Sequence, residues 1–285
     1  MKLSVFFLYV IKLAKEKQIT VEEGLIEVKK MGYTGVELDM AELAVVPNAL
    51  ELFQKHDFTV TSVYGECDIL NGDIARGYAL IDTAKKCGAD KAMILPGCYS
   101  KEELTEKDKK TKAAMYSFLK ENIKANALVE KLKTLCEYGK ERGVVLTIED
   151  FGSSQSLTAY ICQIEWLFKR VKPLRFTFDT GNFYLNGQNV FKAYRKFKKK
   201  SIHVHLKDFL RTPPVHSAEF SYQAISVPVG GGEGNVEKLV KKFLRAGYDG
   251  YFVVEYLGTD NFEYILRQSA VFMLGIGKEK DKWKK

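Results

Sequence analysis

The sequence is poor in the residues that usually build zinc ribbons and disulfide frameworks. Its 285 residues include only five cysteines. Because this number is odd and no two of the cysteines form a CxxC pair, neither a structural zinc site nor a set of disulfides is indicated. A reducing cytoplasm is therefore the expected compartment.

The chain also lacks a segment that requires a membrane. The N-terminal MKLSVFFLYVIKL carries an early lysine and an apolar run, as signal peptides do, but no small-residue cleavage site follows it. The residues that come next, AKEKQITVEEG, lead directly into a helical pattern. We therefore interpret KLSVFFL as a first strand and expect no membrane partner.

The excess of positive charge is modest and peripheral. Lysine and arginine number 44 against 36 acidic residues, which makes a formal charge of +8. Residues 196–200 (KFKKK) and the terminal KEKDKWKK hold much of this excess, which favours a solvated helix end and a tail over a binding face. Without a base-stacking motif, the sequence offers no support for a nucleic-acid partner. We expect one domain over residues 1–276 and a lysine-rich tail over residues 277–285.

Strand-like and helix-like segments alternate along the whole chain. Eight strand-like segments can be counted, and a long amphipathic helix is expected over residues 111–142. The segments GYTGVEL and GYDGYFVVEY place similar glycine turns before the second and eighth strands. Alternation implies a parallel sheet, and eight βα units in this length favour an α/β fold in which a single domain forms a closed TIM (β/α)8 barrel.

Four strand-like segments in the C-terminal half each end in a potential metal ligand. They are VVLTIED at Glu149, RFTFDTGN at Asp179, SIHVHLKD at His205 and YFVVEY at Glu255. Because side chains alternate along a strand, the four residues lie on a polar inner face, while the apolar residues between them face the helices. In such a barrel the carboxyl ends of the strands meet at the functional rim. His203 shares this face, and we interpret it as a buried, hydrogen-bonded neighbour.

These residues resemble the sugar phosphate isomerase/epimerase family of xylose isomerase-like TIM barrels. The resemblance covers nearly the whole chain, from GYTGVEL to GYDGYFVVEY, and its most specific parts are FDTGN, HVHLKD, PVGGGEGNVEKLVKKF and the glutamates that end the fifth and eighth strands. It implies that Glu149, Asp179, His205 and Glu255 bind one divalent metal ion.

The ligand set suggests a chemistry. One imidazole and three carboxylates form a hard shell suited to Mn²⁺, Mg²⁺ or Co²⁺, with Zn²⁺ as a further candidate. A metal bound by a sugar carbonyl and the adjacent hydroxyl would acidify the neighbouring C–H and stabilise an enediolate. The resemblance implies that Glu149 and Glu255 remove and return the proton, in an isomerase or epimerase of a small sugar, sugar phosphate or polyol.

Four further residues are candidates for substrate binding. Lys207 and Arg211 extend the rim beyond His205, and Arg211 has the forked geometry that suits a carboxylate or phosphate. Asn182 stands where many relatives carry histidine, and Gln155 stands where some sugar epimerases carry a second glutamate. These changes leave the four ligands intact but argue against the substrate of any well-known ketose epimerase. Three other acidic residues belong to the expected rim without an assigned role: Glu37, Glu66 and Asp68.

The segment after His205 is unusually long for a βα loop. Residues 209–235 greatly exceed the roughly two to six residues that such loops usually have, which favours a lid or a subunit contact. Its glycines at 229–235 match neither GxGxxG nor a Walker sequence, so a turn whose Asn235 caps the next helix is favoured over a phosphate cradle. The phosphate cradle stays open at this point.

Three other functions are alternatives to the isomerase or epimerase. A lyase or dehydratase on the same barrel would begin with the same proton abstraction, so the sequence does not distinguish it from an isomerase or epimerase. An abasic-site endonuclease needs a histidine-rich three-metal cluster, and the chain has four histidines in total. A non-catalytic sugar-binding protein would be marked by lost ligands, and all four are present. A homo-oligomer is compatible with the sequence but not required by it.

Overall fold

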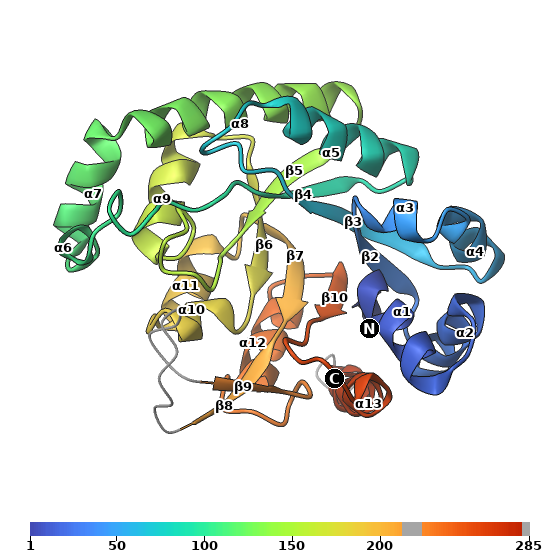
Figure 1. Ribbon diagram of the computed structural model, residues 1–285. Coiled ribbons are helices and arrows are strands. Elements are labelled where there is room, and N and C mark those ends of the chain that lie inside the picture. The colour runs from blue at the N-terminus through green and yellow to red at the C-terminus, as the bar shows by residue number, and fades with distance from the viewer. Residues whose placement is uncertain (213–223, 281–285) are drawn as a thin grey trace.

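The eight expected barrel strands are present, and their order closes a ring. The computed structural model describes residues 1–212 and 224–280. Within these residues, eight parallel strands form a closed barrel in the order β1–β10–β7–β6–β5–β4–β3–β2 (Figure 1). Their bounds are β1 Lys2–Phe6, β2 Gly35–Asp39, β3 Thr59–Glu66, β4 Lys91–Leu95, β5 Val145–Glu149, β6 Arg175–Asp179, β7 Ser201–Leu206 and β10 Tyr251–Val254. The predicted single-domain TIM barrel is confirmed.

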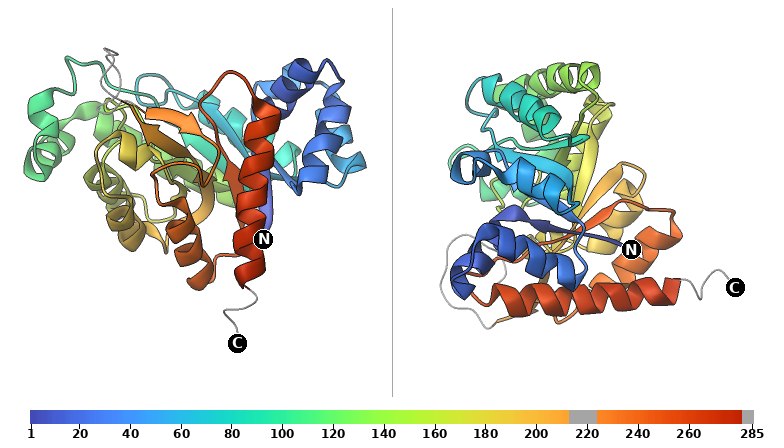
Figure 2. Two further views of the ribbon diagram at one scale, coloured as in Figure 1. Left: turned by 90° about the horizontal axis from the view of Figure 1, so that it is seen from below. Right: turned by 90° about the vertical axis from the view of Figure 1, so that its right-hand side faces the viewer.

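Helices connect successive strands and surround the barrel, as Figures 1 and 2 show. Thr20 and Glu23 start one of them, α2, with a reciprocal capping box, and Gly32 ends it at φ 105°. The helices are α1 Phe7–Lys17, α2 Val21–Met31, α3 Glu42–Val45, α4 Ala49–Lys55, α5 Ala75–Lys86, α6 Glu106–Lys109, α7 Lys112–Glu121, α8 Ile123–Glu141, α9 Ile161–Arg170, α10 Asn182–Leu185, α11 Val190–Phe197, α12 Val236–Arg245 and α13 Phe262–Lys280. No helix in the described ranges is long and apolar enough to cross a membrane.

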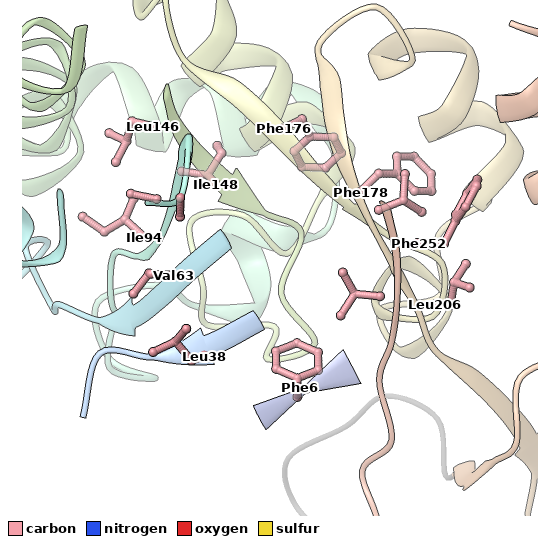
Figure 3. Close-up of a cluster of buried hydrophobic side chains, with 14 of the residues drawn as sticks. Phe6, Leu38, Val63, Ile94, Leu146, Ile148, Phe176, Phe178, Leu206 and Phe252 are labelled. Atoms are coloured by element: carbon pink, nitrogen blue, oxygen red, sulfur yellow. The ribbon is translucent and has the colours of Figure 1, made fainter. Parts of the chain in front are cut away.

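The two faces of the strands differ as the sequence predicts. Inside the barrel, polar side chains pair between neighbouring strands, such as the hydroxyls of Thr147 and Thr177 at 2.8 Å. The outward side chains, such as Phe176 and Phe178, are buried between strands and helices (Figure 3). Burial of each such side chain contributes about 1.5–3 kcal/mol to folding. The polar residues are therefore confined to the barrel interior and its rim.

The first strand is shorter than the sequence predicts. It ends at Phe6, and α1 begins at Phe7 within the same apolar run. Phe7, Val10 and Leu13 are all fully buried in α1. The continuous apolar run concealed this boundary because a buried strand and the buried face of a helix can follow each other without a polar residue between them.

The long helix expected over residues 111–142 is two helices, which corrects the prediction. Thr111 caps α7, and Asn122 separates α7 from α8 with an extended backbone at φ −73° and ψ 120°. The side chain of Asn122 accepts the N–H of Ala125 at 2.8 Å. Asparagine is a preferred N-cap residue, so it starts a new helix here although the apolar pattern continues.

The long segment after β7 contains a hairpin that the sequence analysis missed. Strands β8 Asp208–Arg211 and β9 Ala224–Val227 pair in antiparallel fashion on the carboxyl-terminal side of the barrel. Residues 213–223 lie outside the described residues, so the expectation of a lid or subunit contact stays a prediction. Helix α13 continues past the expected domain end at residue 276, and residues 281–285 of the expected tail also lie outside the described part.

Candidate active site

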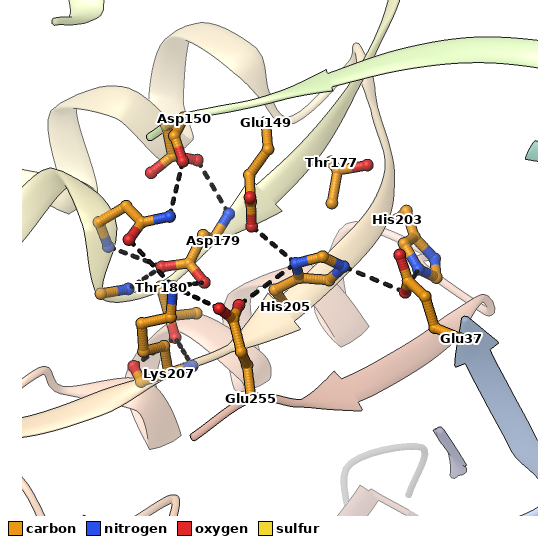
Figure 4. A network of polar contacts seen from close by, with 12 residues as sticks. Glu37, Glu149, Asp150, Thr177, Asp179, Thr180, His203, His205, Lys207 and Glu255 are labelled. Atoms are coloured by element: carbon orange, nitrogen blue, oxygen red, sulfur yellow. Dashed lines mark hydrogen bonds and ion pairs between the residues drawn. The ribbon is translucent and has the colours of Figure 1, made fainter. Parts of the chain in front are cut away.

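Four neighbouring strands bring the expected ligands to one end of the barrel. Glu149 ends β5, Asp179 ends β6, His205 lies on β7 and Glu255 directly follows β10. The register aligns them, because Asp179 pairs with His205 between β6 and β7. Each residue offers a ligand atom, and these atoms all lie within 4.8 Å of one another (Figure 4). We call these residues the four-ligand cluster.

The carboxylates of the cluster keep oxygen atoms available. Asp179 Oδ1 accepts the backbone N–H groups of Gly181 and Asn182 at 2.7 and 2.6 Å. Asp179 Oδ2 and Glu255 Oε2 are buried and have no hydrogen-bond partner, although each has a cationic or ring nitrogen at 3.5 or 3.4 Å. Buried acceptors without hydrogen bonds are costly, so a hard divalent cation would suit this donor set.

Burial and mutual repulsion shape the electrostatics of the cluster. Burial raises the pKa of Asp179 to about 8, and the carboxylates of Glu255 and Glu149 add to the rise while Lys207 opposes it. Burial likewise raises the pKa of Glu149. Burial opposes ionisation of Glu255 too, but Lys207 and His205 hold its pKa at about 2. A divalent cation would relieve the repulsion among these carboxylates.

The comparison with known families agrees with this architecture. A sequence model described as Xylose isomerase-like TIM barrel matches residues 25–274, which is most of the chain. The chain belongs to this family. The resemblance found in the sequence is thereby confirmed. No curated protein matches the chain.

Several solved structures share the barrel at low sequence identity. The probable 3-DHS dehydratase AsbF from Bacillus anthracis is 15% identical, with 96% of this chain and 99% of that chain covered at a TM-score of 0.70. The IolI protein with a bound zinc atom is 17% identical, with 98% and 99% covered at 0.69. The 3-keto-D-glucoside 4-epimerase YcjR from E. coli is 16% identical, with 89% and 94% covered at 0.63. At these identities the likeness concerns the fold.

Two of the four expected substrate-binding residues lie beside the cluster. Lys207 is buried, and its Nζ lies 2.7 Å from Glu255 Oε1 and 3.0 Å from Asn182 Oδ1. Asn182 is also buried and donates from Nδ2 to the backbone oxygen of Asp150 at 2.7 Å. Both residues line the cavity above the cluster. The cavity therefore has an ammonium and an amide beside the four-ligand cluster.

The other two candidates are engaged elsewhere. Gln155 lines the cavity, but its Nε2 donates to the backbone oxygens of Ser100 and Leu104, and its Oε1 accepts from Lys109 at 2.7 Å. Arg211 lies on β8 with a side chain that is 64% exposed, forms an ion pair with Glu233 at 3.4 Å and does not line the cavity. The structure thus brings Gln155 to the edge of the site, where its side chain holds a neighbouring loop in place. It does not bring Arg211 to the site.

The sequence analysis missed the roles of three buried residues around the cluster. The Oδ1 of Asp150 accepts the backbone N–H of Asp179 at 2.9 Å. Thr180 exchanges hydrogen bonds with the backbone of Lys207 at 2.8 and 2.9 Å. Glu37 accepts from the ring of His205 at 3.1 Å. Asp150 and Thr180 each directly follow a ligand in the sequence, and this adjacency was the available signal.

The glycine-rich segment binds the chain's own carboxylate. The backbone N–H groups of Gly230, Gly232 and Gly234 each donate to Asp208 at 3.0 Å. These N–H groups are therefore not available to bind a phosphate. The segment forms a turn, as the sequence analysis favoured. Asn235 occupies the N-cap position of α12 with a left-handed backbone at φ 55°, but its side chain accepts no N–H of that helix and its Nδ2 donates instead to the backbone oxygen of Glu233.

Three residues of the cluster, Glu149, His205 and Glu255, line a cavity of about 650 Å³, whereas Asp179 is fully buried and does not line it. Apolar and aromatic side chains form most of the wall, including those of Tyr9 and Tyr64. The remaining lining residues are Phe6, Leu8, Met93, Leu95, Lys101, Phe151, Gly152, Ser153, Ser154, Gln155, Asn182, Leu185, Lys207 and Leu257.

Proposed function

We propose that the protein is a divalent-metal-dependent isomerase or epimerase of a small sugar or polyol. The single observation that carries this proposal is the four-ligand cluster, which combines one imidazole with three carboxylates and contributes Glu149, His205 and Glu255 to the lining of a cavity. Two of its buried oxygens have no hydrogen-bond partner. Enclosed cavities with a few convergent polar groups are the usual place for small-molecule chemistry.

The proposed ligands are Glu149, Asp179, His205 and Glu255, and the metal ion is Mn²⁺, Mg²⁺ or Co²⁺, with Zn²⁺ as a further candidate. When bound, such an ion supplies Lewis acidity to a substrate carbonyl. The oxygen-rich shell favours the harder ions of this set. The zinc atom in the IolI structure is compatible with a related site.

Two carboxylates of the cluster are the proposed groups for proton transfer. Glu149 Oε1 and Glu255 Oε2 lie 2.6 and 3.4 Å from the same nitrogen of His205. Glu255 follows β10, which neighbours β7 on one side, and Glu149 ends β5, which is the second strand on the other side. One of them would take the proton from the carbon next to the carbonyl and leave an enediolate. The other would return a proton to the opposite face of that carbon in an epimerase, or to its neighbour in an isomerase. Lys207 and Asn182 would hold substrate oxygens.

An uncharged substrate suits the described residues better than a sugar phosphate. The amides of the glycine-rich segment are bound to Asp208. Among the described residues that line the cavity, Lys101 and Lys207 are the only lysines, and arginine is absent. Phosphate sites usually combine several cations with backbone amides. The apolar walls would instead contact the C–H faces of a sugar or polyol ring.

A dehydratase is the second candidate, because it would use the same first proton abstraction. The structural likeness to the probable 3-DHS dehydratase AsbF favours keeping this alternative. The two reactions differ in the fate of the hydroxyl on the carbon beyond the abstracted proton, which leaves as water only in the dehydratase. Product analysis by NMR therefore separates them. A cytoplasmic location and a homo-oligomer stay predictions.

The test begins with the metal content of the purified protein. Mn²⁺ binding is measured by calorimetry for wild type, Glu149→Gln and Asp179→Asn, with Glu66→Gln as a control, since Glu66 is an exposed carboxylate at the end of β3 outside the cluster. We expect one ion per chain, weakened by the first two changes and unaffected by the third. Ketoses and polyols are then screened for exchange of a C–H proton with deuterated water. Absence of metal binding in wild type would refute the proposal.

A further inference from the structure

Behind the four-ligand cluster, three buried side chains are linked across the inside of the barrel. Glu37 Oε2 lies 2.6 Å from His203 Nε2 and 3.1 Å from His205 Nε2 (Figure 4). All three residues are fully buried. Strands β2 and β7 are not neighbours in the barrel, so Glu37 spans the interior to reach both histidines. We call Glu37, His203 and His205 the histidine relay.

The two ring nitrogens of His205 face different partners. Its Nδ1 lies 2.6 Å from Glu149 Oε1 and 3.4 Å from Glu255 Oε2, within the four-ligand cluster. Its Nε2 faces Glu37. The ring of Phe6 meets the imidazole edge-on with 5.1 Å between ring centres, which hinders rotation of the imidazole. Nδ1 is therefore the nitrogen that can serve as a ligand in this orientation.

We propose that Glu37 is a positioning residue that prepares His205 for metal binding. By accepting the N–H of Nε2, Glu37 keeps that proton on Nε2 and leaves the lone pair of Nδ1 for the cation. His203 donates to the same oxygen and holds the Glu37 carboxylate in place. A ligand histidine whose second nitrogen donates to a carboxylate is both oriented and made more basic. This inference rests on the proposed metal-dependent function.

The same three residues could be considered as a second metal site, because their ligand atoms also lie within 4.8 Å of one another. A neutral imidazole has one lone pair, so His205 can be a ligand in only one of the two groups at a time. The four-ligand cluster offers three carboxylates, whereas the relay offers one. Both Nε2 atoms also approach Glu37 at hydrogen-bond distances. The histidine relay therefore supports a cation in the four-ligand cluster and does not bind a second cation itself.

The proton position on His205 can be measured directly. Long-range ¹H–¹⁵N NMR on protein labelled with ¹⁵N-histidine reports which ring nitrogen carries hydrogen, and His205→Gln assigns the signal among the four histidines of the chain. With one equivalent of Zn²⁺, we expect wild-type His205 to keep its proton on Nε2 and to bind through Nδ1. Binding of zinc through Nε2 would overturn the inference.

Calorimetry with Mn²⁺ measures how much the positioning of His205 by Glu37 contributes to the affinity for the metal ion. Glu37→Gln keeps the shape of the side chain but removes its charge, and we expect the affinity for Mn²⁺ to fall by about 10- to 100-fold. Glu42→Gln is the matched control, because Glu42 is another buried glutamate near β2, its polar contact is the N–H of Asp39, and it does not belong to either group. An unchanged affinity in folded Glu37→Gln would contradict the relay.

The outcomes separate this inference from the proposed function. If wild type binds Mn²⁺ and Glu37→Gln binds it equally well, the metal centre stands and the relay is refuted. If wild type binds no metal, the proposed function and the relay are both refuted. Circular dichroism establishes whether Glu37→Gln folds. Should it not fold, the zinc-loaded wild-type NMR spectrum still decides which nitrogen of His205 binds.

Discussion

Lys207 Nζ lies 2.7 Å from Glu255 Oε1, while the other oxygen of that carboxylate has no hydrogen-bond partner. The buried ammonium of Lys207 thus pairs with one oxygen of the Glu255 carboxylate. The other oxygen faces the remaining residues of the four-ligand cluster. Lys207 also approaches Asp179 Oδ2 at 3.5 Å. The lysine therefore stabilises a group of carboxylates that would otherwise repel one another.

Replacement of this lysine should destabilise the metal-free protein. In Lys207→Met the buried charges of Glu255 and Asp179 lose their ammonium partner, and the free energy of unfolding should fall by about 3 kcal/mol. Mn²⁺ should restore more stability to this variant than it adds to wild type. Urea unfolding with and without Mn²⁺ measures both effects. Lys30→Met, at an exposed ion pair with Glu27, is the control, and equal metal-free stability of the two variants would contradict the prediction.

The buried carboxyl of Glu42 should make stability depend on pH. Burial raises its pKa to about 8 from an ordinary value of 4.5. The folded protein therefore keeps a proton that the unfolded chain has already lost, so stability should fall as pH rises from 4.5 to 8 and change no further above that. Each pKa unit corresponds to about 1.4 kcal/mol.

Glu42→Gln should remove this loss. A glutamine oxygen can still accept the N–H of Asp39, which Glu42 accepts at 3.2 Å. The stability of the variant relative to wild type should therefore increase from pH 5 towards pH 8, as measured by thermal unfolding at a series of pH values. Glu66→Gln, at an exposed glutamate, should show no such trend. A constant difference between Glu42→Gln and wild type would show that the carboxyl does not titrate in this range.

Asp208 should hold the glycine-rich segment in place. Its two oxygens accept the N–H groups of Gly230, Gly232 and Gly234, and an amide has only one acceptor oxygen. Asp208→Asn should therefore lose at least one charge-assisted bond and destabilise the protein by about 2 kcal/mol. Hydrogen exchange by mass spectrometry should show faster exchange over residues 229–235, and unchanged exchange there would contradict this role.

The break between α7 and α8 should depend on Asn122. Asn122→Ala removes the acceptor for the N–H of Ala125 and should cost about 1 kcal/mol of stability. Lys120→Ala, two residues earlier at an exposed position, should cost little because it removes no cap. Urea unfolding compares the two variants. A similar stability for both would show that packing, rather than the cap, ends α7.

Much of the barrel and its rim could be predicted because both follow from local patterns. Alternation of side chains along a strand places Glu149, Asp179 and His205 on the inner face, and the ends of parallel strands meet at one rim. The same reasoning fails at Asn122 and at Phe7, where apolar residues continue through a change of element. Patterns of burial show that a segment is inside the protein but do not show where its backbone turns.

The sequence by itself determined the closed barrel and the strand ends on which the expected ligands lie, because periodicity and short connections leave few other arrangements for eight βα units. Only the tertiary structure decided which polar groups satisfy one another. Glu37 and His203 are separated by 166 positions in the chain, and their contact depends on two strands that are not neighbours in the barrel. Likewise, Asp208 accepts the glycine N–H groups, and Arg211 on β8 pairs with Glu233 and does not line the cavity. These contacts depend on the distances and directions between side chains in three dimensions, which cannot be obtained from the spacing of residues along the sequence.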